Sequence, residues 1–135
     1  MTAAHSLRHG DAVPHFVVRT HDGTVLDYAR TIWQRRSLVF VAVPSTKRDQ
    51  RYLEEFARQT PSFNDHESTV VITEERIRGL PAPGLLVADR WGEIVHVVTP
   101  HAVTDFPSAT TLLQWVEAIE HRCPECDGEA EYLSG

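Results

Sequence analysis

The feature that most constrains this chain is an uninterrupted apolar run, LVFVAV, at residues 38–43. A strand with one face in water alternates apolar and polar residues, whereas a strand covered on both faces is apolar at successive positions. The segment 37–43 therefore predicts a central strand, which ends at Pro44 because proline cannot donate to a sheet ladder. A sheet covered by helices on both faces is typical of an α/β domain.

Turn signals and periodicity place the other elements around this strand. Asp22-Gly23 predicts a tight hairpin turn, and Thr46 with Asp49 resembles a capping box ahead of apolar residues at helical spacing. Two prolines in LPAPG predict a fixed turn at residues 80–84, and Ser108 is placed to cap the last helix, which ends near residue 121. The expected strands are 14–20, 24–26, 37–43, 69–73, 85–89 and 93–98, and the earlier helices are 27–35 and 47–59.

Length and charge limit the organisation of the chain and its partners. With 135 residues there is room for one domain, expected over 13–121 between an N-terminal arm (1–12) and a C-terminal tail (122–135). The net charge of -6 opposes binding to nucleic acid or to a membrane surface. No apolar stretch suits a signal sequence or a membrane span, so we expect a cytoplasmic protein that binds another protein or a second copy of itself.

Several segments resemble a known family. GDAVPHF at residues 10–16, followed by HDG at 21–23, resembles the opening of the peroxiredoxins, the family of alkyl hydroperoxide reductases and thiol-specific antioxidant proteins. LPAP before LLVADRWGEI is similar to the cis-proline strand of thioredoxin folds, and the segment 106–126 resembles the ending of a bacterial peroxiredoxin-like group. The resemblance implies a thioredoxin-like α/β fold with a central mixed sheet flanked by helices, an N-terminal β-hairpin, and a cis-proline at Pro83.

The position of the catalytic thiol departs from the family pattern. The Cys-x-x-Cys of thioredoxins, laid over residues 40–48, falls on Ser45 and Arg48. The peroxiredoxin pattern of proline, three residues, Thr or Ser, two residues and Cys, begun at Pro44, falls on Arg48 and Arg51. Peroxide reduction needs a thiolate that is oxidised and then recycled, so the resemblance does not bring peroxidase activity with it.

The same loop admits two interpretations. The free N–H groups at the start of the expected helix favour an anion, and cations cluster there in the group Ser45, Thr46, Lys47, Arg48 and Arg51. The simpler interpretation, which we favour, is that Ser45 or Thr46 caps the helix while the basic side chains face water.

The only two cysteines, Cys123 and Cys126, form a CPEC motif in the tail. The pair can be a reversible disulfide, half of a zinc site, or two free thiols. Its place after a helix C-terminus, among acidic residues, disfavours the thiolate, whereas zinc would deprotonate both thiols and tolerate acidic neighbours. Two cysteines supply half of the usual four ligands, so His121 with another histidine, or the same pair from a second subunit, would complete the site.

Together these features predict a peroxiredoxin-like protein that has lost its nucleophile and serves as an accessory or binding module, with a redox-sensitive or metal-binding tail. One alternative is a thiol-disulfide oxidoreductase in which Cys123 and Cys126 are brought towards Pro83. Another is a structural homodimer stapled by zinc through paired tails. The sequence has no Gly-rich phosphate loop, and zinc is the only cofactor it suggests.

Overall fold

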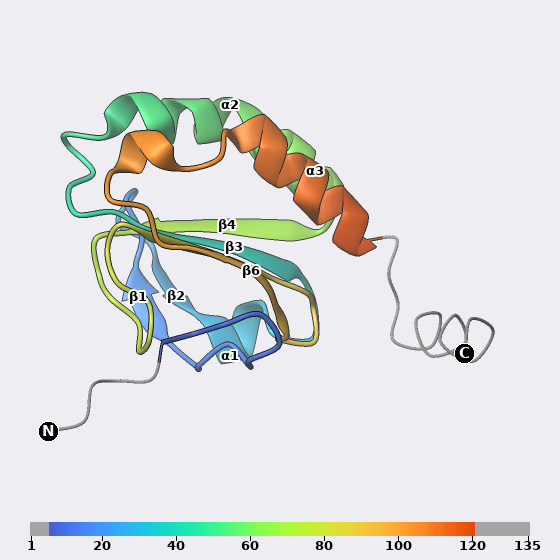
Figure 1. Ribbon diagram of the computed structural model, residues 1–135. Coiled ribbons are helices and arrows are strands. Elements are labelled where there is room, and N and C mark those ends of the chain that lie inside the picture. The colour runs from blue at the N-terminus through green and yellow to red at the C-terminus, as the bar shows by residue number, and fades with distance from the viewer. Residues whose placement is uncertain (1–5, 121–135) are drawn as a thin grey trace, which may run out of the picture.

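The computed structural model describes residues 6–120 (Figure 1). Its main sheet has four strands in the order β4-β3-β5-β6. β3 (Ser37–Ala42) pairs in parallel with β4 (Ser68–Thr73) and antiparallel with β5 (Gly84–Ala88), and β5 pairs antiparallel with β6 (Ile94–Val98). The prediction of a central mixed sheet is confirmed, and the apolar run forms an inner strand of which every residue is buried.

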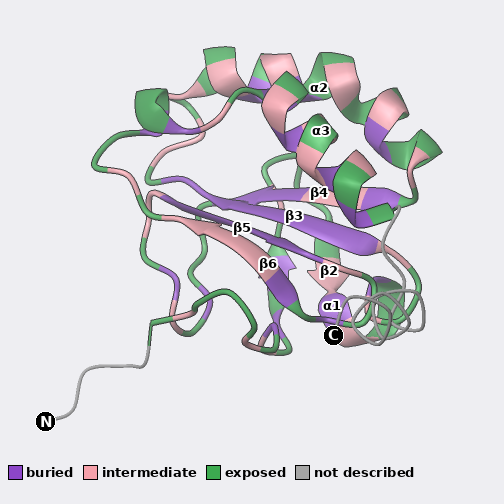
Figure 2. Ribbon diagram, turned by 45° about the vertical axis from the view of Figure 1, so that its right-hand side comes forward, coloured by how far each residue is buried: buried purple, intermediate pink, exposed green. Residues whose placement is uncertain are grey.

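Helices and a hairpin cover the two faces of this sheet (Figures 1 and 2). α2 (Gln50–Asp65) and α3 (Ala109–Glu120) lie on one face, and a short 3-10 helix, η1 (Val103–Asp105), precedes α3. The other face carries α1 (Tyr28–Thr31) and the hairpin of β1 (Val17–Arg19) and β2 (Val25–Asp27).

The two covered faces explain why β3 is apolar at successive positions. Val39 and Val41 belong to the core beneath α2 and α3, whereas Leu38 and Phe40 belong to the core beneath the hairpin and α1. Successive side chains of a strand point to opposite faces, so each core receives every second residue.

Two predicted helices have different bounds in the structure. α1 ends at Thr31 instead of residue 35, and Gln34 has a φ of 66°, a conformation that cannot continue a right-handed helix. α2 begins at Gln50 instead of residue 47 and continues past Pro61 to Asp65 instead of ending at 59. The buried Phe63 follows Pro61, so packing against the core holds the helix together beyond the proline.

The predicted capping box of Thr46 and Asp49 is wrong. Asp49 precedes α2 but its side chain makes no capping hydrogen bond. Thr46 instead bonds to Glu74, which follows β4. A long-range partner therefore takes the side chain that the local pattern assigned to the helix.

The remaining boundaries agree more closely with the predictions. The hairpin turn places Gly23 at a φ of 89°, as Asp-Gly predicts, although its strands are shorter than 14–20. Ser108 caps α3, since its hydroxyl accepts the N–H of Thr111 at 3.1 Å. Between residues 6 and 120, none of the helices has the length and apolarity that crossing a membrane requires.

Candidate functional site

The loop after β3 connects the central strand to α2. Ser45 organises it: the Ser45 hydroxyl accepts the N–H of Arg48 at 3.2 Å, and the Ser45 carbonyl accepts the N–H of Asp49 at 3.2 Å. Ser45 therefore binds N–H groups of the turn ahead of the helix, whereas α2 itself has no side-chain cap, so the expectation that Ser45 or Thr46 caps it is wrong. The basic side chains of the loop do face water, as the same interpretation expected.

Glu74 supplies a negative charge to this loop from the end of β4. Both the N–H and the hydroxyl of Thr46 donate to Glu74 Oε2, at 3.1 and 2.6 Å. These two hydrogen bonds hold the pKa of Glu74 below its usual range, so the carboxylate is ionised at neutral pH. A fixed anion beside the start of α2 opposes a second anion there.

Two arginines occupy the positions where the peroxiredoxin pattern places Thr or Ser and the nucleophilic cysteine. The side chain of Arg48 is 69% exposed, and its Nε lies 3.9 Å from Asp49 Oδ1. Arg51 lies in the first turn of α2 and is exposed. Both cysteines of the chain lie beyond residue 120, so none of residues 44–51 supplies a thiol of its own.

Pro83 lies beside this loop. The Ala82–Pro83 peptide bond is cis. Gly84, which follows, pairs with Ala42 at the end of β3, so the proline segment borders the point where the loop begins. The backbone is tightly packed here, because a Cβ on Gly84 would lie 2.1 Å from the carbonyl oxygen of Pro81.

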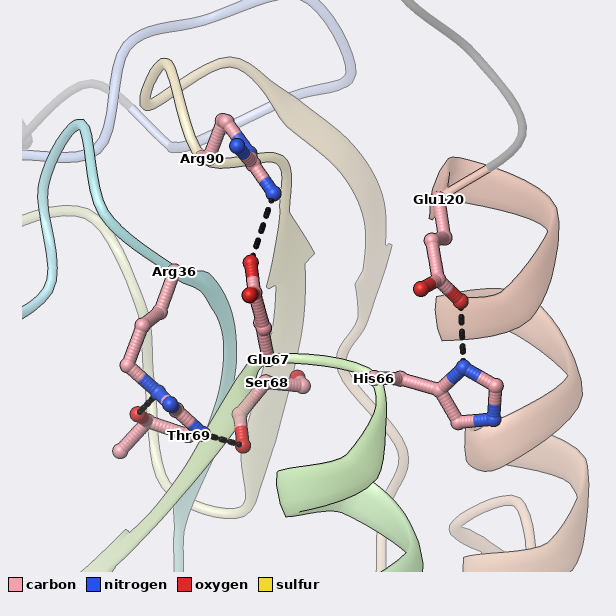
Figure 3. A network of polar contacts seen from close by, with 7 residues as sticks. All are labelled: Arg36, His66, Glu67, Ser68, Thr69, Arg90 and Glu120. Carbon is pink, nitrogen blue, oxygen red and sulfur yellow. Dashed lines mark hydrogen bonds and ion pairs between the residues drawn. The ribbon is translucent and has the colours of Figure 1, made fainter.

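The end of α3 carries a cluster that the sequence did not reveal (Figure 3). His66, just after α2, binds Glu120 through Nδ1, and its Nε2 lies 3.4 Å from Glu117. The hydrogen bond to Glu120, followed by the charges of both carboxylates, raises the pKa of His66. No periodicity signal links these residues, because the cluster depends on how α2 packs against α3.

The predicted tail ligands, Cys123, Cys126 and His121, lie outside the described residues, of which the last, Glu120, binds His66. Over the part of the chain that the structure covers, no group of three His, Cys, Asp or Glu side chains is arranged to hold a metal ion.

Comparison with known proteins reveals likeness in structure. No protein-family model matches the chain, and no curated protein matches its sequence. AhpC of Mycobacterium tuberculosis superposes with a TM-score of 0.66 at 12% identity, covering 89% of this chain and 98% of that protein.

Two further solved structures support the same assignment of fold. The mitochondrial 2-Cys peroxiredoxin of Plasmodium falciparum has a TM-score of 0.65 at 10% identity, covering 84% of this chain and 95% of its own. A putative thiol:disulfide interchange protein DsbE of Chlorobium tepidum has a TM-score of 0.55 at 16% identity, covering 85% of this chain and 99% of that chain. The chain therefore has a thioredoxin-like fold, similar to that of the peroxiredoxins.

Proposed function

We propose that this protein is a peroxiredoxin-like accessory or binding module without peroxidase activity, which acts on another protein or on a second copy of itself in the cytoplasm. Its CPEC tail serves as a redox-sensitive or zinc-binding element. The observation that carries the proposal is the exposed guanidinium of Arg51, at the position where the peroxiredoxin pattern has its nucleophilic cysteine.

The chemistry of peroxide reduction explains why Arg51 matters. A thiolate attacks one peroxide oxygen, the O–O bond breaks, and the products are a sulfenic acid and water or an alcohol. An arginine side chain remains protonated at neutral pH and has no sulfur to oxidise. The N–H groups of Thr46 and Arg48 are also already bound, by Glu74 and Ser45 respectively.

A peroxidase assay tests this part of the proposal. The full-length protein, with dithiothreitol or a thioredoxin system as reductant, is given hydrogen peroxide, and the Cys123→Ser/Cys126→Ser variant is the matched control. We expect both proteins to consume peroxide no faster than the reductant does alone. Consumption at the rate of an authentic peroxiredoxin by the wild type would contradict the proposal.

The tail is tested separately, by metal content and redox midpoint in protein purified without reductant or chelator. We expect either a reversible Cys123–Cys126 disulfide or bound zinc. Free thiols under every condition would contradict a role for the tail. Rapid insulin reduction, lost in Cys123→Ser, would favour the oxidoreductase instead, and zinc at about half a mole per chain, lost together with dimerisation, would favour the stapled homodimer.

A further inference from the structure

β4 is an edge strand of the main sheet, and part of its outer edge is open. Alternate residues of a parallel strand direct their backbone groups to opposite sides. The Thr73 carbonyl accepts the N–H of Val43 on the β3 side, whereas the Ile72 carbonyl accepts the N–H of His21 from the hairpin turn. Val70 therefore faces outward like Ile72, and no backbone bond from the hairpin reaches it within residues 6–120.

A cavity of about 430 Å³ lies beside this open edge, between β4 and α2. Leu53, Phe56 and Phe63 supply an apolar wall. Ser68, at the start of β4, also lines the cavity, and its hydroxyl is buried without a hydrogen-bond partner in the described part of the chain. Native proteins rarely leave a buried hydroxyl unpaired, so this one points to a ligand that supplies the partner.

Arg36 binds two of the residues that line the cavity, Ser68 and Thr69 (Figure 3). Its guanidinium donates to Thr69 Oγ1 at 2.8 Å, to Asn64 Oδ1 at 3.0 Å and to the Ser68 carbonyl at 3.0 Å. These acceptors are neutral, and Arg36 forms no ion pair with the carboxylates of residues 6–120. An oriented guanidinium without a counter-charge favours a ligand that carries a carboxylate.

The chain itself has such a segment close by. The described part ends at Glu120, whose carboxylate binds His66, two residues before β4 (Figure 3). The segment 125–131 carries four carboxylates and is followed directly by Tyr132 and Leu133. The nine residues from Glu120 to residue 129 can span up to about 30 Å, enough to reach the cavity from this end.

We propose that the segment 127–134 binds across the open part of the outer edge of β4, at Val70, between the Ser68 carbonyl bound by Arg36 and the Ile72 carbonyl bound by His21. Its carboxylates pair with Arg36, its backbone bonds Val70, and Tyr132 enters the apolar cavity beside the unpaired Ser68 hydroxyl. The order of the residues fits, because a tail entering at the Ser68 end brings its acidic part to Arg36 before its apolar part reaches the cavity. As in strand addition, backbone bonds at the sheet edge provide affinity and a side-chain pocket provides specificity.

Amide hydrogen exchange of the full-length protein, followed residue by residue by NMR, tests the proposal. Tyr132→Ser and Arg36→Gln should each make the Val70 amide exchange about tenfold faster or more, because the segment that bonds it is lost. The amide of Val71, whose backbone faces β3 by the same alternation, should be unchanged and so shows that the fold is intact. Arg30→Gln, at an arginine whose side chain is 86% exposed, is the matched control and should leave both amides unaffected.

A synthetic peptide of residues 127–135 provides the second arm. Added to the Tyr132→Ser protein, it should restore the protection of Val70, whereas a peptide of reversed sequence should not. Equal exchange at Val70 in the wild type and both variants would overturn the proposal. Protection that falls on dilution of the wild type would also overturn it, by assigning the groove to a second copy of the chain. The proposal does not depend on the absence of peroxidase activity.

Discussion

Gly84 is the position where a single methyl group should disturb the site most. It begins β5, directly after the cis-proline, and an added Cβ would lie 2.1 Å from the Pro81 carbonyl oxygen and 3.0 Å from Leu80 Cγ. The carbonyl is backbone and cannot rotate away as a side chain can, so the segment ahead of β5 must move by roughly 1 Å in a close-packed interior. Gly84→Ala should therefore cost about 3 kcal/mol of unfolding free energy, the upper part of the range for overpacking.

Urea unfolding followed by circular dichroism measures this cost, and a melting temperature about 10 °C lower should accompany it. Gly23→Ala is the control, since Gly23 has nothing within 4 Å of the added Cβ but has a φ of 89°. It should lose about 1 kcal/mol, from backbone conformation alone. A loss for Gly84→Ala no larger than for Gly23→Ala would refute the steric argument.

Three further outcomes follow from the contacts. Thr73→Val leaves the carbonyl of Arg19 without the hydroxyl that donates to it at 2.7 Å and should cost about 1–3 kcal/mol in urea unfolding, with Thr73→Ser restoring most of it. Tyr52→Phe removes a hydrogen bond of 2.8 Å to a backbone carbonyl and should cost about 1 kcal/mol in the same assay. The raised pKa of His66 means that the protonated side chain, paired with Glu120, stabilises the fold. This stabilisation is fully present below the unfolded-state pKa of about 6.5 and is lost as the pH rises through the folded-state pKa. Glu120→Gln should flatten this part of the profile of stability against pH and lower the pKa of His66 in an NMR titration.

The sequence predicted those parts of the fold that depend on patterns within one segment. The apolar run identified β3 as an inner strand, because burial on both faces removes polar residues from successive positions. The Asp22-Gly23 turn and the Ser108 cap are also local, and both are present.

Features that depend on distant residues were not predictable in this way. Thr46 matched a local capping pattern, but its partner is Glu74, which the topology of the sheet brings beside the loop. α2 continues past Pro61 because Phe63 is buried against the core, a gain that outweighs the helix propensity of the segment. The sequence pattern likewise places Arg51 at the position of the peroxiredoxin thiol, because that comparison is local. It gives no sign of the negative charge that Glu74 brings to the same loop from the end of β4.

The central claim is that the protein, with Arg51 where the peroxiredoxin pattern has its nucleophilic cysteine, has no peroxidase activity. The most direct test mixes the fully reduced wild-type protein with one equivalent of hydrogen peroxide in a stopped-flow instrument and then locates the oxidised residue by mass spectrometry. The account predicts slow loss of peroxide, at the rate of an unactivated thiol such as free cysteine, with any oxidation confined to Cys123 and Cys126. A rapid phase that consumes the full equivalent of peroxide would contradict it.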